Sequence, residues 1–238
     1  MSNTEQLNRN YLKDKKPLVY EKTQKFAERY KNGESIVIIQ LQYNYMCNMK
    51  CQHCSIERFQ KKRDVRRMKP ADVAELAKQA DILGLARFVI TGGEPLIFPD
   101  LDEIVSAINP QKFYINCDSN GWYLEEKAAH LKDIGIDRIQ LSLDSLNAEE
   151  HDDFRRMPGA HARAMRGIDE CLKIGLPLYI QIVVTKERLH SDEFIKFVEF
   201  FNAKGLNVFV NYAKPVGAWE GCYDNLIDIN DMAYMNEL

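Results

Sequence analysis

The sequence predicts an α/β fold in which six parallel strands form an open, partial (β/α)6 barrel. Three observations support this prediction: short apolar strand segments, amphipathic helical segments between them, and a glycine where a helix meets the next strand. The repeated order of helix, glycine and strand is typical of parallel sheets, in which a helix returns the chain to the start of the next strand. A flat, doubly wound sheet is the competing architecture, because periodicity alone does not distinguish the two.

The predicted strands are apolar and rich in β-branched or aromatic residues, as expected for strands that are buried on both faces. They are residues 35–44, 85–93, 112–121, 137–145, 177–185 and 207–215. The predicted helices place apolar residues on one face at helical spacing. They are residues 19–30, 70–83, 101–108, 123–134, 160–174 and 192–203. Four helices end at a glycine, which suits the left-handed residue that closes a helix. These glycines are Gly84, Gly135, Gly175 and Gly205.

The chain divides into three segments. Residues 1–34 are polar and charged and are interpreted as a lead-in to the core, which is predicted to span residues 35–215. Residues 216–238 resemble the start of a C-terminal extension, because a helical pattern begins at Asp228 and reaches the last residue without a stop signal. We therefore expect this sequence to be a fragment of a longer protein.

The composition is that of an ordinary globular protein, since 45% of the 238 residues are hydrophobic and 28% are charged. The formal net charge of −3 does not fit a protein that binds nucleic acid by neutralising phosphates. No apolar run approaches the roughly 20 residues of a membrane-spanning helix, and the polar N-terminus is not a secretory signal. Six cysteines, three of them clustered, indicate a reducing cytoplasm and a metal or cluster site.

Polar or glycine-rich residues follow nearly every predicted strand. In a parallel βα array the carboxyl ends of the strands lie on one face, where such folds build active sites. We therefore expect these residues, although distant in sequence, to converge. They are the cysteine loop, Thr91, Gly92, Gly93, Glu94, Asp118, Ser119, Asn120, Gly121, Ser142, Asp144, Thr185, Asn211 and Tyr212.

The strongest local signal is the loop that contains Cys47, Cys51 and Cys54, at spacings of four and three residues. Three thiolates from one compact loop suit a zinc ion or an iron–sulfur cluster. A structural zinc usually has four ligands, and His53 is a poor fourth ligand because it adjoins Cys54. A cubane cluster held by three cysteines leaves one iron open for chemistry. The spacing favours the cluster, and zinc remains the alternative.

Taken together, these motifs resemble those of the radical S-adenosylmethionine (SAM) superfamily. The Cys-x3-Cys-x2-Cys loop follows the first strand, and the GGEP sequence at residues 92–95 follows the second. The sequences LSLDS at 141–145 and HDDFR at 151–155 resemble the branch with SPASM or twitch modules. That branch includes sulfatase-maturing enzymes, peptide maturases and molybdenum-cofactor cyclases. The resemblance covers about residues 35–215 and implies a partial, TIM-like barrel.

The resemblance also implies the cofactors. Cys47, Cys51 and Cys54 would ligate an oxygen-sensitive [4Fe–4S] cluster, and SAM would bind its fourth iron. One electron would then cleave SAM to a 5′-deoxyadenosyl radical that abstracts hydrogen from the substrate. Gly92 and Gly93 would let the backbone approach SAM closely, and Glu94 would accept hydrogen bonds from its amino group. Auxiliary iron–sulfur clusters would lie in a region that this sequence does not contain.

Other SAM-binding residues follow from the resemblance. Ser142 and Arg155 match residues that contact the ribose and the carboxylate of SAM. Arg156 stays open as an alternative, because the segment is one residue longer than in those relatives. Asp118 matches a position that reaches the ribose hydroxyls, and His53 a position that packs near the adenine. Ordinary loop and surface roles remain the alternatives for these residues.

The prediction is therefore an enzyme that acts by radical chemistry on a small-molecule or peptide substrate. It would need a one-electron donor such as flavodoxin or ferredoxin, and the basic run at residues 61–67 could dock such an acidic partner. A glycyl-radical-enzyme activase and a methyl transferase that uses SAM are enzymatic alternatives. A zinc-binding module without catalysis is the alternative from another class, and it leaves the strand-end motifs unexplained.

Overall fold

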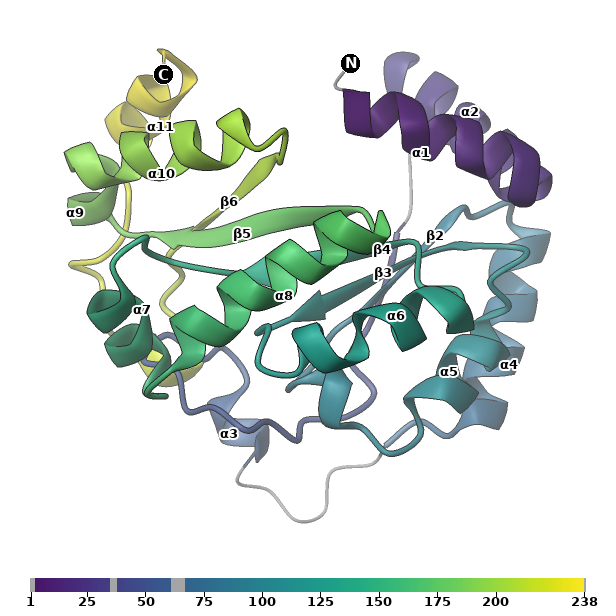
Figure 1. The fold of residues 1–238 in the computed structure, drawn as a ribbon, viewed down its shortest axis with the longest axis horizontal. Helices are drawn as coiled ribbons and strands as arrows, with labels where there is room; N and C mark the ends of the chain where they lie inside the picture. Colours follow the sequence, from purple (N-terminus) through teal and green to yellow (C-terminus); the bar gives the residue numbers. More distant parts are fainter. Residues whose placement is uncertain (1–2, 35–37, 61–66, 238) are drawn as a thin grey trace.

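The computed structural model describes residues 3–34, 38–60 and 67–237. Six parallel strands form one curved sheet in the order β1-β2-β3-β4-β5-β6 (Figure 1). They are β1 (Ile39–Leu41), β2 (Arg87–Ile90), β3 (Tyr114–Ser119), β4 (Arg138–Ser142), β5 (Leu178–Val184) and β6 (Val208–Tyr212). A doubly wound sheet reverses its strand order at a switch point, whereas this order is uninterrupted. The predicted partial barrel is confirmed, and the flat alternative is wrong.

The helices cover the convex side of the sheet and its two ends (Figure 1). They are α1 (Asn3–Lys15), α2 (Pro17–Lys31), α3 (Glu57–Gln60), α4 (Pro70–Ile82), α5 (Leu101–Ile108), α6 (Leu124–Ile134), α7 (Ala148–Arg155), α8 (Ala160–Ile174), α9 (Lys186–Leu189), α10 (Asp192–Ala203) and α11 (Ile229–Glu237), with the 3-10 turns η1 (Pro95–Ile97) and η2 (Gly217–Trp219). The bounds of α5, α8 and α10 agree with the prediction. The four glycines that were predicted to follow helices have positive φ angles from 66° to 103°.

The expectation that the strands are buried on both faces is wrong for β2 and β4, whose residues alternate between buried and half-buried, whereas β3 is buried along nearly its whole length. In β4 the side chains of Ile139 and Leu141 point to the helices and belong to the main hydrophobic core. The alternate residues of β4, from Arg138 through Gln140 to Ser142, line a cavity on the concave side. The physical reason is the half-barrel itself, because its inner face encloses a polar chamber rather than a second layer of helices.

The N-terminal segment closes the end of the barrel at which the strands begin (Figure 1). Leu12 and Val19 pack against Tyr114, the first residue of β3. The buried ammonium group of Lys16 lies 2.6 Å from a carboxylate oxygen of Asp137, just before β4. Helices α1 and α2 are therefore attached to the barrel by apolar packing and by a buried ion pair.

Two expectations fall on residues outside the described ranges. The predicted first strand began at residue 35, and residues 35–37 are not described. Its predicted end at residue 44 is wrong, because β1 spans Ile39–Leu41 and residues 42–44 are not strand. The basic run that was considered as a docking surface falls mostly on residues 61–66, which are also outside these ranges. Among the described helices, none has the length and apolar character needed to cross a lipid bilayer.

Candidate functional site

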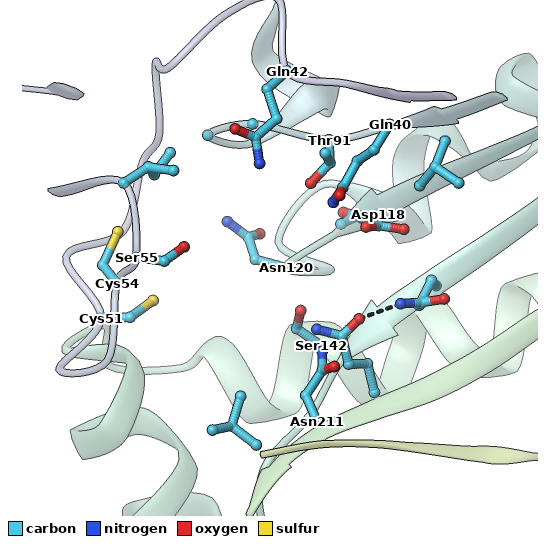
Figure 2. Close-up of a pocket in the computed structure, with 18 of the residues that line it drawn as sticks. Gln40, Gln42, Cys51, Cys54, Ser55, Thr91, Asp118, Asn120, Ser142 and Asn211 are labelled. Carbon is cyan, nitrogen blue, oxygen red and sulfur yellow. Dashed lines mark hydrogen bonds between the residues drawn. The ribbon is translucent and has the colours of Figure 1, made fainter. Parts of the chain in front are cut away.

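A cavity of about 1030 Å³ occupies the concave side of the sheet and opens at the carboxyl ends of the strands (Figure 2). All six strands contribute to its wall. The predicted site residues that line it are Cys47, Cys51, His53, Cys54, Gly92, Gly93, Asp118, Ser142 and Arg155. The expected convergence of strand ends is therefore confirmed for these residues, whereas Glu94, Gly121, Asp144 and Thr185 are not among the residues that line the cavity.

The cysteine loop lies between β1 and α3 at the mouth of this cavity. Its thiols are free, and Figure 2 shows the sulfurs of Cys51 and Cys54 at one side of the chamber. A backbone turn from the Cys54 amide to the Cys51 carbonyl, at 3.3 Å, shapes the loop. Burial raises the pKa of the Cys47 thiol to about 12. These thiols must lose their protons when they bind a metal, because the thiolate is the ligand.

The donor set fits an iron–sulfur cluster better than a single ion. A tetrahedral zinc needs each sulfur about 2.3 Å from one point, and within the described ranges no three His, Cys, Asp or Glu side chains are arranged around one metal ion. A cubane cluster carries several irons, so its three ligands do not have to meet at one point. Cys47, Cys51 and Cys54 could thus hold a cluster at the cavity mouth.

Gly92 and Gly93 press the end of β2 against the segment that leads into the cysteine loop. The Gly93 amide donates to the Asn44 carbonyl at 3.1 Å, and the next amide donates to the Met46 carbonyl at 2.7 Å. A Cβ atom at Gly93 would lie only 1.8 Å from the Met46 carbonyl oxygen. The glycines therefore allow two protein backbones to meet, besides lining the cavity.

Replacing Gly93 with alanine should displace the cysteine loop and reduce iron incorporation strongly. The added methyl group overlaps a backbone carbonyl that cannot move without the loop, and overpacking of this kind typically costs about 1–3 kcal/mol or more. Iron content per chain after anaerobic reconstitution measures the effect. Gly84→Ala is the control for backbone strain away from the loop, because its φ of 69° also disfavours alanine but its new methyl meets no atom within 4 Å. Normal iron content in Gly93→Ala would contradict the close approach.

Glu94 lies behind the cavity wall, although direct contact with SAM was expected. Its buried carboxylate accepts hydrogen bonds from the Leu96 amide at 3.0 Å, the Ser119 hydroxyl at 2.8 Å and the Asn120 amide at 2.6 Å. These bonds tie the end of β2 to the end of β3. Burial raises the pKa of this carboxyl to about 7, although the three hydrogen bonds oppose the shift.

Asn120 lines the cavity; the sequence placed it among the converging strand-end residues but gave it no role. Its side-chain amide donates to the side-chain Oδ1 of Asn48 in the cysteine loop at 2.9 Å. Figure 2 places the same side chain between the cysteines and Asp118. Through the Asn120 backbone, Glu94 therefore acts on the position of the cysteine loop. The Asp-Ser-Asn-Gly sequence at a strand end was the available signal.

Arg155 is buried at the end of α7 and pairs with a carboxylate. Its Nε lies 2.7 Å from Asp144 Oδ2, and its Nη1 points to Cys51 Sγ at 3.8 Å. Asp144 also accepts a hydrogen bond from the Val183 amide at 3.1 Å. Burial would raise the pKa of Asp144, but Arg155, together with the nearby histidines and the Val183 amide, lowers that pKa to about 2. Arg156 has a φ of 50° at the C-cap of α7 and is not among the cavity-lining residues, so the geometry selects Arg155.

His53 lies in an aromatic group at the cavity edge. Its ring stacks on Phe154 with centroids 4.4 Å apart, and Trp219 of η2 is 5.8 Å away. Burial lowers the pKa of His53 to about 3, so the ring is neutral near pH 7. The sequence did not reveal Phe154 or Trp219 as site residues, because they come from segments far from the cysteine loop.

Asp118 faces the cavity while its neighbour Ser119 faces Glu94, which settles the orientation that strand alternation left open. One carboxylate oxygen of Asp118 is buried without a hydrogen-bond partner among the described residues. Burial raises the pKa of Asp118 to about 7, although Arg138 and the Thr91 hydroxyl oppose the shift. Ser142 and Thr91 lie on either side of the same space (Figure 2).

The raised pKa of Asp118 predicts a stability that falls as pH rises. The pKa of Asp118 is about 7 in the folded protein against an ordinary value of 3.8. Between these two pH values the folded protein therefore holds a proton that the unfolded chain has lost. The stabilisation is complete below about pH 4 and is lost as pH rises through 7, with a total of a few kcal/mol at most.

Urea unfolding at pH 5 and pH 8 measures this change in the free energy of unfolding, and Asp118→Asn should reduce the difference between the two pH values. Glu94 titrates in the same window, so the remaining slope belongs to it. An unchanged slope in the variant would contradict the assignment.

Comparison with known proteins identifies the family. Residues 41–201 match the sequence profile of the Radical SAM superfamily. The chain belongs to the radical SAM superfamily. The matched range contains the cysteine loop, the GGEP motif and Arg155, and it includes most of the residues that line the cavity.

The curated relatives that match this radical SAM chain include GTP 3′,8-cyclases. The GTP 3′,8-cyclase of Helicobacter pylori is 32% identical over 177 residues, which is 73% of this chain and 54% of that protein. A probable GTP 3′,8-cyclase of Methanothermobacter thermautotrophicus is 30% identical over 201 residues, 83% of this chain and 63% of that protein. The chain thus spans less than two thirds of the length of these relatives.

Solved structures share the fold of this radical SAM chain. Streptococcus suis SuiB bound to S-adenosylmethionine aligns with a TM-score of 0.68 at 20% identity, over 92% of this chain and 51% of that one. The anSMEcpe protein with bound AdoMet aligns with a TM-score of 0.64 at 17% identity, over 83% of this chain and 57% of that one. These similarities show a common half-barrel.

Proposed function

We propose that this protein is a radical SAM enzyme that reductively cleaves S-adenosylmethionine and uses the resulting radical on an organic substrate. The observation that carries the proposal is the meeting of three free thiols with Asp118, Ser142 and Arg155 around one cavity. Cys47, Cys51 and Cys54 would hold a [4Fe–4S] cluster, which would supply the electron for reductive cleavage of SAM.

The chain itself binds and orients SAM in this proposal. Arg155 offers a guanidinium edge suited to the SAM carboxylate, and Asp144 fixes its orientation through the 2.7 Å contact. Ser142 and Asp118 offer a hydroxyl and a carboxyl to the ribose diol. Gly92 and Gly93 leave backbone groups accessible to the SAM amino group. Glu94 acts indirectly in this arrangement, because its carboxylate is occupied by the loop after β3.

The substrate is proposed to be a small molecule or a peptide. The GTP 3′,8-cyclases among the relatives support a small molecule, and a solved neighbour, SuiB, is bound to its precursor peptide SuiA. A flavodoxin or ferredoxin is the proposed electron donor, and a reducing cytoplasm suits the free thiols. Auxiliary clusters of the SPASM or twitch type are proposed only if the full protein is longer than this sequence.

Anaerobic reconstitution followed by reaction with SAM and dithionite tests the proposal. The expected result is about four iron and matching sulfide per chain, with 5′-deoxyadenosine and methionine as products by mass spectrometry. S-adenosylhomocysteine in place of 5′-deoxyadenosine would indicate methyl transfer instead. Stoichiometric zinc without sulfide would refute the enzyme and support the zinc-binding alternative.

A further inference from the structure

The floor of the cavity, at the starts of the strands, carries two arginines that the proposed SAM site does not use. Arg87 begins β2 and Arg138 begins β4, and both line the cavity. Ser142 lies four residue steps along β4 from Arg138, which corresponds to about 13 Å along the strand. The arginines therefore lie deep in the barrel, well below the strand ends at which the cysteine loop sits.

Neither arginine has an anionic partner within the described part of the chain. No described carboxylate oxygen lies within 4.0 Å of Arg87 or Arg138. Burial lowers the pKa of Arg87, and the neighbouring charge of Arg138 lowers it further. Asp118 is near enough for Arg138 to lower its pKa, but the two do not form an ion pair. Two guanidinium groups thus face one chamber and repel each other.

Polar atoms at this floor are buried and lack partners. The Arg138 Nε is buried with no hydrogen-bond partner among the described residues. Asn116, between the two arginines on β3, is 3% exposed, lines the cavity, and has an unpartnered Oδ1. Buried polar groups in folded proteins nearly always have partners, so these atoms indicate a ligand that completes the floor.

Aromatic rings hold the guanidinium groups in place without using their N–H edges. The Arg138 guanidinium carbon lies 4.0 Å from the centre of the Tyr179 ring, and that of Arg87 lies 5.4 Å from the centre of Tyr114. A guanidinium stacked on a ring keeps its N–H groups free for a planar anion. Helices α1 and α2 pack behind Tyr114, so a ligand would enter from the strand ends.

We propose that Arg87 and Arg138 bind the anionic end of the substrate, a carboxylate or a phosphate, at the floor of the barrel. This inference rests on the proposed function, because it places the remote end of the substrate below SAM and its reacting part toward the cavity mouth. Asn116 accepts a hydrogen bond from a donor next to that anion. The substrate class is therefore a polar molecule with a terminal anionic group.

Calorimetric titration of the reconstituted protein with pyrophosphate and with succinate tests this anchor. We expect one of these anions to bind, and binding to weaken at least tenfold in both Arg87→Gln and Arg138→Gln. The preferred anion then distinguishes a phosphate from a carboxylate. Arg166→Gln is the matched control, because Arg166 lies on α8 and forms an exposed ion pair with Glu125, and it should bind like the wild type.

Further variants keep the test decisive. Arg138→Lys retains the charge but loses the planar fork, so intermediate affinity is expected. If Arg138→Gln does not fold by circular dichroism, Arg87→Gln on another strand decides the question. No binding of either anion to the wild type, or equal binding in the folded glutamine variants, overturns the anchor. SAM is titrated separately. Anion binding that depends on the arginines, without any binding of SAM, would contradict the proposed function but not the anion site.

Discussion

Cys51→Ala protein is expected to lose nearly all of its iron after anaerobic reconstitution, and to form no 5′-deoxyadenosine. A cluster with only three protein thiolates has no spare ligand, and Cys51 sits at the centre of the loop beside the buried Arg155 guanidinium. Without this thiolate, two of the four irons would have no protein ligand, and the cluster would lose iron to the solution. Iron and sulfide analysis, with the visible absorption of the cluster, measures the effect.

Cys222→Ala is the control for this result. Cys222 is a free and exposed thiol that does not line the cavity, so its variant should keep the iron content and the product yield of the wild type. Undiminished iron in Cys51→Ala would refute the cluster assignment. An equal loss in Cys222→Ala would show that the loop thiols are not the specific ligands.

Asp144→Ala should be the most destabilising single change at the site. Arg155 is only 7% exposed and its Nε contacts Asp144 at 2.7 Å, so the variant leaves a buried charge without its partner. Breaking a buried pair from one side costs about 3–5 kcal/mol. The Val183 amide also loses its acceptor. Urea unfolding of the cluster-free protein measures the free energy of unfolding.

A double-mutant cycle separates the uncompensated charge from general damage. Asp144→Ala combined with Arg155→Met should recover part of the lost stability, because the second change removes the stranded charge. Glu125→Ala breaks the exposed pair with Arg166 and should cost less than about 1 kcal/mol. A double variant that is as unstable as the sum of its single variants would count against the charge argument.

Much of the fold could be predicted from the sequence because the signals are local. Apolar strand segments and the glycines that close helices, such as Gly135 and Gly175, define the order of elements, and parallel strands bring their ends to one face. The meeting of Cys47, Asp118 and Ser142 follows from that order alone. Prediction therefore succeeded where the position along a strand fixes the position in space.

The rest depended on orientations that local patterns do not fix. Glu94 was expected to face SAM, but its carboxylate accepts hydrogen bonds from the Ser119 hydroxyl and the Asn120 amide at the end of β3 instead. Asp144 had no assigned role until the fold placed it against Arg155. The polar inner face was visible in the alternation of Arg138, Gln140 and Ser142, a period of two residues, but the apolar residues between them dominated the interpretation.

The attachment of the first two helices matters for anyone who recombines such barrels. Lys16 is buried against Asp137, and Lys22 reaches Asp81 at 2.6 Å, so these lysines neutralise carboxylates that belong to the barrel. A chimaera that joins this half-barrel to the N-terminal helices of another protein would lack Lys16. The carboxylate of Asp137 would then be buried without its positively charged partner. A domain exchange should therefore include α1 and α2 together with the barrel, and should not begin at the first strand.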